Sequence, residues 1–275
     1  MMVTEAPSPP APQIAAPPLD KRPEAIRGMF ARVAPVYDLL NHLLSASLDR
    51  VWRRKAARAI DFGAAPALDL CCGTGDQALA LQRRGARVAA ADFCLPMVVL
   101  ARRKFAKRGD SRSAAKARET EQTRAAADAG RELPTGAAMP APLVADALTL
   151  PFPTSRFRAA TVSFGLRNVV DLDAAIRELA RVTAPGGQLA VLEFAVPRLR
   201  PLRALYLFYF QRLLPRIGRW ISNDGGAYSY LPASVLAFPQ RQELADRFRA
   251  AGFDEARWED LAGGIVCFYS ARRAR

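Results

Sequence analysis

Two glycines separated by one residue stand between a short apolar segment and a helical pattern. The apolar segment is Ala67–Leu70, the glycines are Gly73 and Gly75, and Asp76 opens the helical pattern. Glycine lets the backbone turn sharply and lets a ligand approach closely, as in the cofactor-binding turns of open α/β sheets. We therefore expect the segment Cys71–Asp76 to form one wall of a cofactor site.

Three aspartates accompany three successive apolar segments. Asp69 lies within the first segment, Asp92 closes the second and Asp146 follows the third. Asp92 can accept hydrogen bonds from both hydroxyls of a ribose, and Asp146 can accept one from an adenine amino group. Asp69 can order the glycine loop beside a cationic sulfonium, where a pyrophosphate would be repelled. These acids favour S-adenosylmethionine as the cofactor. The predicted cofactor contacts are Asp69, Gly73, Thr74, Gly75, Asp92, Asp146, Ala147 and Ser163.

The same glycines also fit a dinucleotide-binding fingerprint. The segment Gly73–Ala78 matches the pattern GxGxxA, and Asp92 stands at about the expected distance for a ribose ligand. An NAD-dependent dehydrogenase therefore stays open as an alternative, although neither a catalytic lysine nor a second histidine is evident for hydride chemistry.

The elements that must position these residues alternate between strand and helix, which is typical of a parallel sheet covered by helices. The expected strands are 67–71, 87–91, 143–145, 159–164 and 188–194, then an antiparallel pair at 253–259 and 265–271. The expected helices are 76–84, 96–105, 171–183 and 240–251, with a turn at 185–187. By analogy of fold, we predict an α/β class I S-adenosylmethionine-dependent methyltransferase. Its Rossmann-like sheet would have seven strands, with the last strand antiparallel and at the edge.

We expect a single methyltransferase domain over residues 25–275. Residues 1–24 are rich in proline and alanine and have few large apolar side chains, which predicts a disordered tail. Apolar residues at helical spacing predict short N-terminal helices over 25–60, interrupted at Pro35. Residues 107–142 are rich in alanine and charge, and they predict a surface insertion that is part helical and largely mobile.

Composition narrows the class of protein. The chain has 275 residues, 51% of them hydrophobic, which is enough for a sizeable core. Its longest apolar stretch, 204–210, is far shorter than the roughly 20 residues that span a membrane. Because the N-terminus also lacks a secretory pattern, we expect the protein in the cytoplasm. The four cysteines and the one histidine, His42, show no metal-ligand spacing, so no metal is predicted.

Two longer motifs extend beyond the cofactor loop. The first is Tyr37-Asp38-Leu39-Leu40-Asn41-His42-Leu43-Leu44-Ser45, continuing to Arg50 and Trp52. The second is Ser163-Phe164-Gly165-Leu166-Arg167-Asn168-Val169, followed by Arg181–Gly187 and Val191–Phe194. In these motifs the sequence resembles the ubiquinone/menaquinone biosynthesis C-methyltransferase family, with Leu40, Ser47 and Asp49 where that family has Met, Gly and His. The similarity covers roughly residues 26–271, apart from the insertion.

The resemblance implies methyl transfer from S-adenosylmethionine to a ring carbon of a demethylated polyprenyl quinol. Demethylmenaquinol is the expected substrate, and the benzoquinol of ubiquinone biosynthesis stays open. The ring carbon becomes nucleophilic when an adjacent hydroxyl loses its proton. Arg167 could stabilise the phenolate and Asn168 could orient a water, while Tyr37 closes over the substrate. Alternatively, Arg167 pairs with Asp171 or Asp173 at the start of the next helix.

The formal net charge of +14 by itself favours neither nucleic acid nor an anionic membrane. The segment 198–220 combines six arginines with large apolar residues and contains no acid. This composition suits weak contact with the anionic inner face of a membrane, where a polyprenyl quinol resides; the alternative is a helix packed on the sheet. Another small-molecule methyltransferase or an RNA methyltransferase is the competing function. Since no RNA-recognition pattern is present, no nucleic-acid partner is expected. A homodimer stays open.

Overall fold

The computed structural model describes residues 19–38, 45, 47–124, 140–209, 212 and 225–275. His42 and most of the first motif lie outside the described residues, as do the tail up to residue 18 and most of the second half of the segment 198–220.

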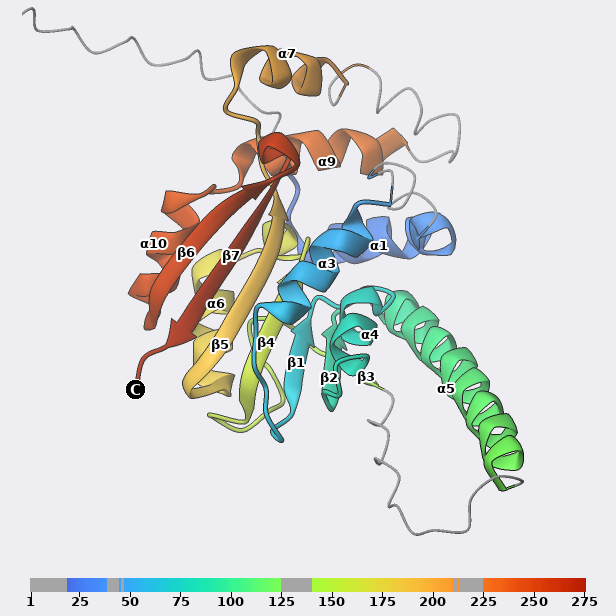
Figure 1. Ribbon diagram of the computed structural model, residues 1–275. Coiled ribbons are helices and arrows are strands. Elements are labelled where there is room, and N and C mark those ends of the chain that lie inside the picture. The colour runs from blue at the N-terminus through green and yellow to red at the C-terminus, as the bar shows by residue number, and fades with distance from the viewer. Residues whose placement is uncertain (1–18, 39–44, 46, 125–139, 210–211, 213–224) are drawn as a thin grey trace, which may run out of the picture.

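In the described part of the chain, seven strands form one sheet in the order β3-β2-β1-β4-β5-β7-β6 (Figure 1). The strands are β1 (Ala67–Leu70), β2 (Val88–Asp92), β3 (Ala141–Val144), β4 (Phe157–Ser163), β5 (Thr183–Phe194), β6 (Phe253–Leu261) and β7 (Val266–Arg273). Strands β1 to β5 run parallel, and β7 runs antiparallel to both β5 and β6. The α/β class and the antiparallel last strand are therefore confirmed. The edge position is wrong, because the hairpin through η4 (Ala262–Gly264) inserts β7 beside β5 and leaves β6 outermost.

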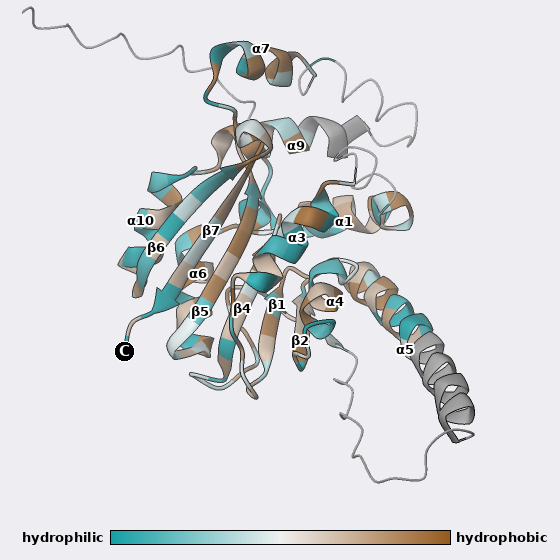
Figure 2. Ribbon diagram, in the orientation of Figure 1, coloured by the Kyte–Doolittle hydropathy of each residue, from teal (hydrophilic) through white to brown (hydrophobic). Residues whose placement is uncertain are grey.

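Helices cover both faces of the sheet. The covering helices are α3 (Asp49–Arg58), α4 (Asp76–Gln82), α5 (Leu95–Arg124), α6 (Leu172–Val182) and α10 (Gln242–Ala250). On one face, α6 and α10 pack against branched side chains such as Val162 and Val191. On the other face, α3, α4 and the start of α5 pack against alanines such as Ala90 and Ala159. Parallel strands buried on both faces are rich in apolar residues, as the brown colouring in the second half of β5 shows (Figure 2).

The remaining helices gather at the end of the sheet where the parallel strands terminate (Figure 1). They are α1 (Pro23–Val33), the 3-10 turn η1 (Ala34–Val36), α7 (Arg200–Phe208) and α9 (Gly225–Ala237). Helix α1 ends two residues before Pro35, in agreement with the predicted interruption. It begins at Pro23, inside the predicted tail, because proline is well suited to the first turn of a helix. Among the described helices, none has the length and apolar character needed to cross a membrane.

Two elements differ from the sequence-based expectation. Helix α5 does not end near Phe105 but continues to Arg124, and its second half projects away from the sheet (Figure 1). Alanine, arginine, lysine and glutamate in this part of the predicted insertion are strong helix formers even without an apolar face. The turn expected at 185–187 is found as a bulge within β5, because Phe157 of β4 pairs with Thr183 and Ala159 with Gln188, which leaves residues 184–187 outside the pairing. Gly186 adopts a φ of 73°, and a register shift against β4 accommodates the irregular start of β5.

Candidate active site

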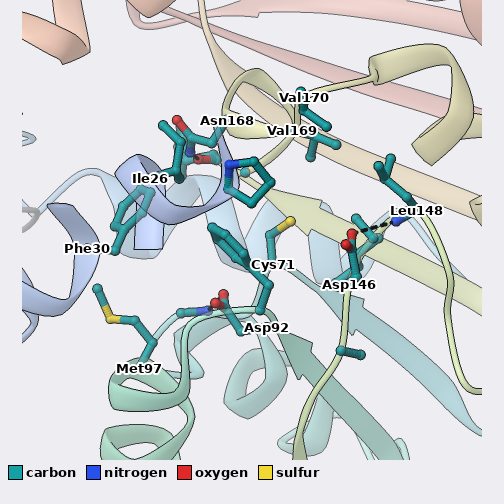
Figure 3. A pocket seen from close by; sticks show the side chains of 18 of the residues that line it. Ile26, Phe30, Cys71, Asp92, Met97, Asp146, Leu148, Asn168, Val169 and Val170 are labelled. Atoms are coloured by element: carbon teal, nitrogen blue, oxygen red, sulfur yellow. Dashed lines mark hydrogen bonds between the residues drawn. The ribbon is translucent and has the colours of Figure 1, made fainter. Parts of the chain in front are cut away.

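A cavity opens at the carboxyl ends of β1, β2 and β4, where open α/β sheets bind ligands (Figure 3). The space that its lining residues enclose, including volume open to solvent, is about 780 Å³. Seven of the predicted site residues line it: Tyr37, Gly73, Asp92, Asp146, Ala147, Ser163 and Asn168. The topology thus brings together residues that are up to 131 positions apart in the sequence, from Tyr37 to Asn168.

The glycine loop forms the floor of the cavity. Gly73 has a φ of 54° and Gly75 a φ of 88°, which are left-handed conformations that glycine adopts without strain. A Cβ at Gly75 would lie 2.3 Å from Cζ of Phe105, so α5 packs directly against this turn. Gly73 faces the cavity, whereas Gly75 lies behind the wall and serves the packing of α4 and α5.

Asp92 joins the loop to the next strand. Its Oδ2 accepts a hydrogen bond of 2.8 Å from the Gly73 amide, and its Oδ1 accepts one of 2.9 Å from the Cys94 amide. Burial raises the pKa of Asp92, and the two amide hydrogen bonds oppose that shift. Each carboxylate oxygen can accept a further hydrogen bond, so Asp92 can still bind ligand hydroxyls in the cavity.

The residues after β3 and β4 complete this side of the wall. Asp146 is exposed, and its Oδ1 accepts a hydrogen bond of 2.9 Å from the Leu148 amide, which leaves Oδ2 directed at ligands or solvent (Figure 3). Ser163 lies at the end of β4 and donates a hydrogen bond of 3.3 Å to Oε1 of Gln77. Ala147 offers only its backbone and methyl group to the cavity.

Asp69 and Thr74 do not line the cavity. Asp69 is fully buried within β1, where its Oδ1 accepts a hydrogen bond of 2.9 Å from Oγ1 of Thr161. Burial raises the pKa of Asp69 to about 7, opposed by the Thr161 hydrogen bond and the charge of Arg53. The side chain of Asp69 thus faces the sheet and the start of α4 and does not line the cavity in which the contact with a sulfonium was expected. Thr74 is also buried and belongs to a polar cluster with Asp38 and Lys104.

Arg167 is placed differently from both sequence-based interpretations. Its guanidinium is buried, lies 3.0 Å from Oε2 of Glu193 on β5, and donates to the Phe164 carbonyl oxygen. Neither predicted acid is its partner: Asp171 caps helix α6, and Asp173 pairs with Arg247 at 2.9 Å. Glu193 lies in the segment Val191–Phe194 of the second motif, and the sequence of that segment does not indicate which cation Glu193 binds.

Asn168 and Tyr37 both line the cavity. The Asn168 Nδ2 contacts the Phe164 carbonyl oxygen at 3.5 Å, while its buried Oδ1 has no hydrogen-bond partner among the described residues. A buried acceptor of this kind can receive a hydrogen bond from a ligand. Tyr37 packs edge-on against Phe30, with ring centroids 6.1 Å apart, and its ring lies over Gly73.

The sequence analysis missed the residues that α1 and the segment before it contribute. Lys21, Pro23, Ile26 and Phe30 line the cavity, although this region was expected to be partly a disordered tail. The helical spacing of Met29, Phe30 and Val33 predicted an apolar helix face, but it did not indicate which part of the protein that face would contact. Met97, at the start of α5, could have been found, because it follows Asp92 at the same strand end.

The sheet with its antiparallel β7 and the cavity at the glycine loop define the fold of the class I S-adenosylmethionine-dependent methyltransferases. A general methyltransferase-domain model matches residues 68–191. An S-adenosylmethionine-dependent methyltransferase of known structure from Thermotoga maritima aligns with a TM-score of 0.56 at 15% identity. The alignment covers 90% of this chain and 99% of that chain.

More specific similarity extends over nearly the whole chain. The model of the ubiE/COQ5 methyltransferase family matches residues 131–273. The chain is 43% identical to the demethylmenaquinone methyltransferase of Thermus thermophilus, over 89% of this chain and 100% of that protein. It is 39% identical to the demethylmenaquinone methyltransferase of Streptomyces avermitilis, over 93% of this chain and 97% of that protein. The chain therefore belongs to the ubiE/COQ5 methyltransferase family and is a methyltransferase, as the two motifs predicted.

Proposed function

We propose that the protein transfers a methyl group from S-adenosylmethionine to a ring carbon of demethylmenaquinol. The observation that carries this proposal is the end-to-end similarity to demethylmenaquinone methyltransferases. It is supported by one cavity that residues of both motifs line. The dehydrogenase alternative loses its support, because the fold and the family are those of methyltransferases.

The residues of the cavity fit S-adenosylmethionine. Asp92 offers two carboxylate oxygens to ribose hydroxyls, Asp146 offers an acceptor to the adenine amino group, and Gly73 presents backbone without a side chain. When bound, the cofactor supplies an electrophilic methyl group. The contribution of the chain is to hold it at a fixed position relative to the acceptor, because alignment of the two reactants lowers the barrier strongly.

The opposite side of the cavity suits an aromatic ring that carries oxygens. Pro23, Ile26, Phe30 and Val169 provide apolar surface, and Asn168 provides the unsatisfied acceptor described above. An apolar wall with a few polar groups is the usual composition of a site that orients a small molecule. The ring and its hydroxyls would then face the cofactor across Tyr37.

The test is methylation of demethylmenaquinol by the purified protein with S-adenosylmethionine, followed by mass spectrometry of the quinone. A gain of one methyl group and one equivalent of S-adenosylhomocysteine is expected. Demethylated ubiquinone precursor, assayed in parallel, decides whether a benzoquinol ring is also accepted. If neither quinol leads to release of S-adenosylhomocysteine, the proposal is contradicted.

The same function places the protein, in our proposal, on the cytoplasmic face of the membrane through weak peripheral contact. Support comes from α7 and the residue before it, where Leu199, Leu205 and Phe208 are 67%, 65% and 56% exposed. Arg198 and Arg200 are exposed on the same segment. Large apolar side chains flanked by arginines are typical of segments that enter the head-group region of an anionic membrane. Because α7 lies at the same end of the sheet as the cavity, a quinol could reach the site from there (Figure 1).

A further inference from the structure

One basic side chain lines the cavity among the described residues, and it comes from outside the sheet. Lys21 lies in the segment that precedes α1, and it lines the cavity together with Pro23 and Ile26 of α1. Its side chain is half-buried. The neighbouring charged residues Asp20 and Arg22 instead pair with each other at 2.7 Å and are exposed to solvent. Lys21 is thus the member of this charged triplet that faces the site.

Lys21 and Asn168 line the same cavity. Asn168 belongs to η2 (Leu166–Asn168), directly after Arg167, which pairs with Glu193. Burial lowers the pKa of Lys21; the charge of Glu193 opposes this shift and that of Arg167 adds to it. The cavity therefore holds a basic side chain from the segment before α1 as well as the amide of Asn168.

Other ionisable groups near this region are less suited to accept a proton from a quinol. Arg167 does not line the cavity, and its guanidinium is occupied by Glu193 and the Phe164 carbonyl. Asp92 accepts from two backbone amides at the glycine loop, and Asp146 is exposed and bonded to the Leu148 amide. Cys71 and Tyr37 also line the cavity. Burial raises the pKa of Cys71, and a tyrosine carries its own proton at neutral pH.

We propose that Lys21 is the general base of the methyl transfer, a proposal that rests on the function given above. The neutral amine of Lys21 accepts the proton of the quinol hydroxyl adjacent to the reacting carbon, which leaves an ammonium–phenolate pair. The electron pair of the ring carbon forms a bond to the methyl carbon, the methyl–sulfur bond breaks, and its electrons stay on sulfur. The ring then loses its proton to water as the ammonium returns a proton to the oxygen. One proton is released overall.

The chemistry of lysine fits this assignment. Its pKa moves readily on burial, which makes a neutral amine accessible, and after protonation its charge stabilises the phenolate. Arginine would keep the positive charge but could not accept a proton, since the guanidinium stays protonated in proteins. The two roles of Lys21, proton acceptor and cation, can therefore be separated by substitution.

The experiment compares Lys21→Met and Lys21→Arg with the parent protein, using demethylmenaquinol and S-adenosylmethionine in single-turnover mode. We expect both variants to lose on the order of 100-fold or more in rate, the usual contribution of a general base. Their dissociation constants for S-adenosylmethionine and their melting temperatures should stay close to those of the parent. The parent rate should rise with pH to a plateau, and the Lys21→Met rate should lack that rise. Arg22→Met is the matched control, because Arg22 is adjacent in sequence but exposed.

Each result decides the assignment. Parent-like turnover in Lys21→Met or in Lys21→Arg would overturn the proposal, as would an unchanged pH dependence in a slow variant. A variant that no longer binds S-adenosylmethionine would show that Lys21 holds the site together and would also overturn it. A parent protein that does not methylate the quinol would instead contradict the proposed function. An active parent with active Lys21 variants would contradict this inference alone.

Discussion

Asp92 is the residue on which cofactor affinity should depend most. Its carboxylate holds the glycine loop through the Gly73 amide and faces the cavity at the same time. We expect Asp92→Ala to weaken S-adenosylmethionine binding by about 10- to 100-fold, since a hydrogen bond to a charged group contributes roughly 1.5–3 kcal/mol. Calorimetry would measure this, with Asp254→Ala on the exposed edge strand β6 as the control. Equal affinity in both variants would remove Asp92 from the cofactor site.

The buried pair of Arg167 and Glu193 gives a prediction about stability. Arg167→Ala leaves the Glu193 carboxylate buried without its cation, and we expect the free energy of unfolding to fall by about 3–5 kcal/mol. Replacing both residues, as in Arg167→Met with Glu193→Leu, should recover much of that loss because no lone charge remains buried. Urea unfolding of the two variants tests this. A double variant as unstable as the single one would contradict it.

Asp69 gives the protein a pH-dependent stability. Its folded-state pKa of about 7 lies above the ordinary value of 3.8, mainly because of burial. Between about pH 4 and 7 the folded state holds this proton and the unfolded state does not, so stability falls as pH rises through that window. Asp69→Asn cannot ionise, and its loss of stability between pH 5 and 8 should be smaller by on the order of 1 kcal/mol or more. Denaturant unfolding at the two pH values measures the difference. Parallel curves for parent and variant would show that Asp69 does not titrate in this range.

Among the elements, α5 connects the N-terminal motif to the glycine loop. Lys104 lies 2.6 Å from Oδ2 of Asp38 and 3.0 Å from Oδ1 of Asp76, and it donates to Oγ1 of Thr74 at 3.0 Å. Asp38 follows Tyr37, whose ring lies over Gly73. One partly buried lysine therefore fixes three segments around the cofactor wall.

We expect Lys104→Met to raise the KM for S-adenosylmethionine about tenfold, with a smaller effect on kcat. Loss of the lysine removes the two ion pairs that connect α5 to Asp38 and Asp76, and so weakens the connection between the Tyr37 segment and the loop. Arg103→Met, on the exposed side of the same helix, serves as the control. Steady-state kinetics separates the two constants, and a fall in kcat alone would assign Lys104 a different role.

At this scale the sequence predicted elements well where residue type and spacing act locally. The segment Ala67–Asp76 is apolar, then glycine-rich, then helical, and each part specifies its own conformation. The insertion was predicted to be part helical, but its continuity with the helix before Phe105 was not predicted. Helix propensity outweighs the lack of apolar residues in this stretch. The turn expected at 185–187 lies inside β5 as a bulge, because pairing with β4 jumps from Thr183 to Gln188 and pairing with β7 begins only at Gln188.

For the whole molecule, the site was predictable where strand ends converge and unpredictable where distant segments cover it. Asp92, Asp146 and Ser163 follow strands, so topology alone brings them to one edge. The ion-pair partner of Arg167 could not be chosen from the sequence. Asp171 and Asp173 follow Arg167 closely, and Glu193 lies in a later part of the same motif. The approach of Lys21 and Ile26 to the cavity depends on tertiary packing of α1, which no local pattern encodes.

The attachment of the whole molecule to a membrane is the remaining prediction. We expect the protein to co-sediment with anionic vesicles and to be released by high salt. Each arginine near α7 contributes about 1 kcal/mol to the binding free energy when the membrane surface is negative, and salt screens that attraction. The double variant Leu205→Glu, Phe208→Glu should reduce binding at least tenfold. Burial of each of these exposed apolar side chains contributes a free energy of roughly 1.5–3 kcal/mol. Val144→Glu, at an exposed position on the edge strand β3, is the matched control. If the α7 variant binds like the parent, or if binding ignores lipid charge and salt, α7 is not the membrane contact. The methyltransferase assignment would be unaffected, because it depends on the family similarity and on the cavity at the glycine loop, and not on α7.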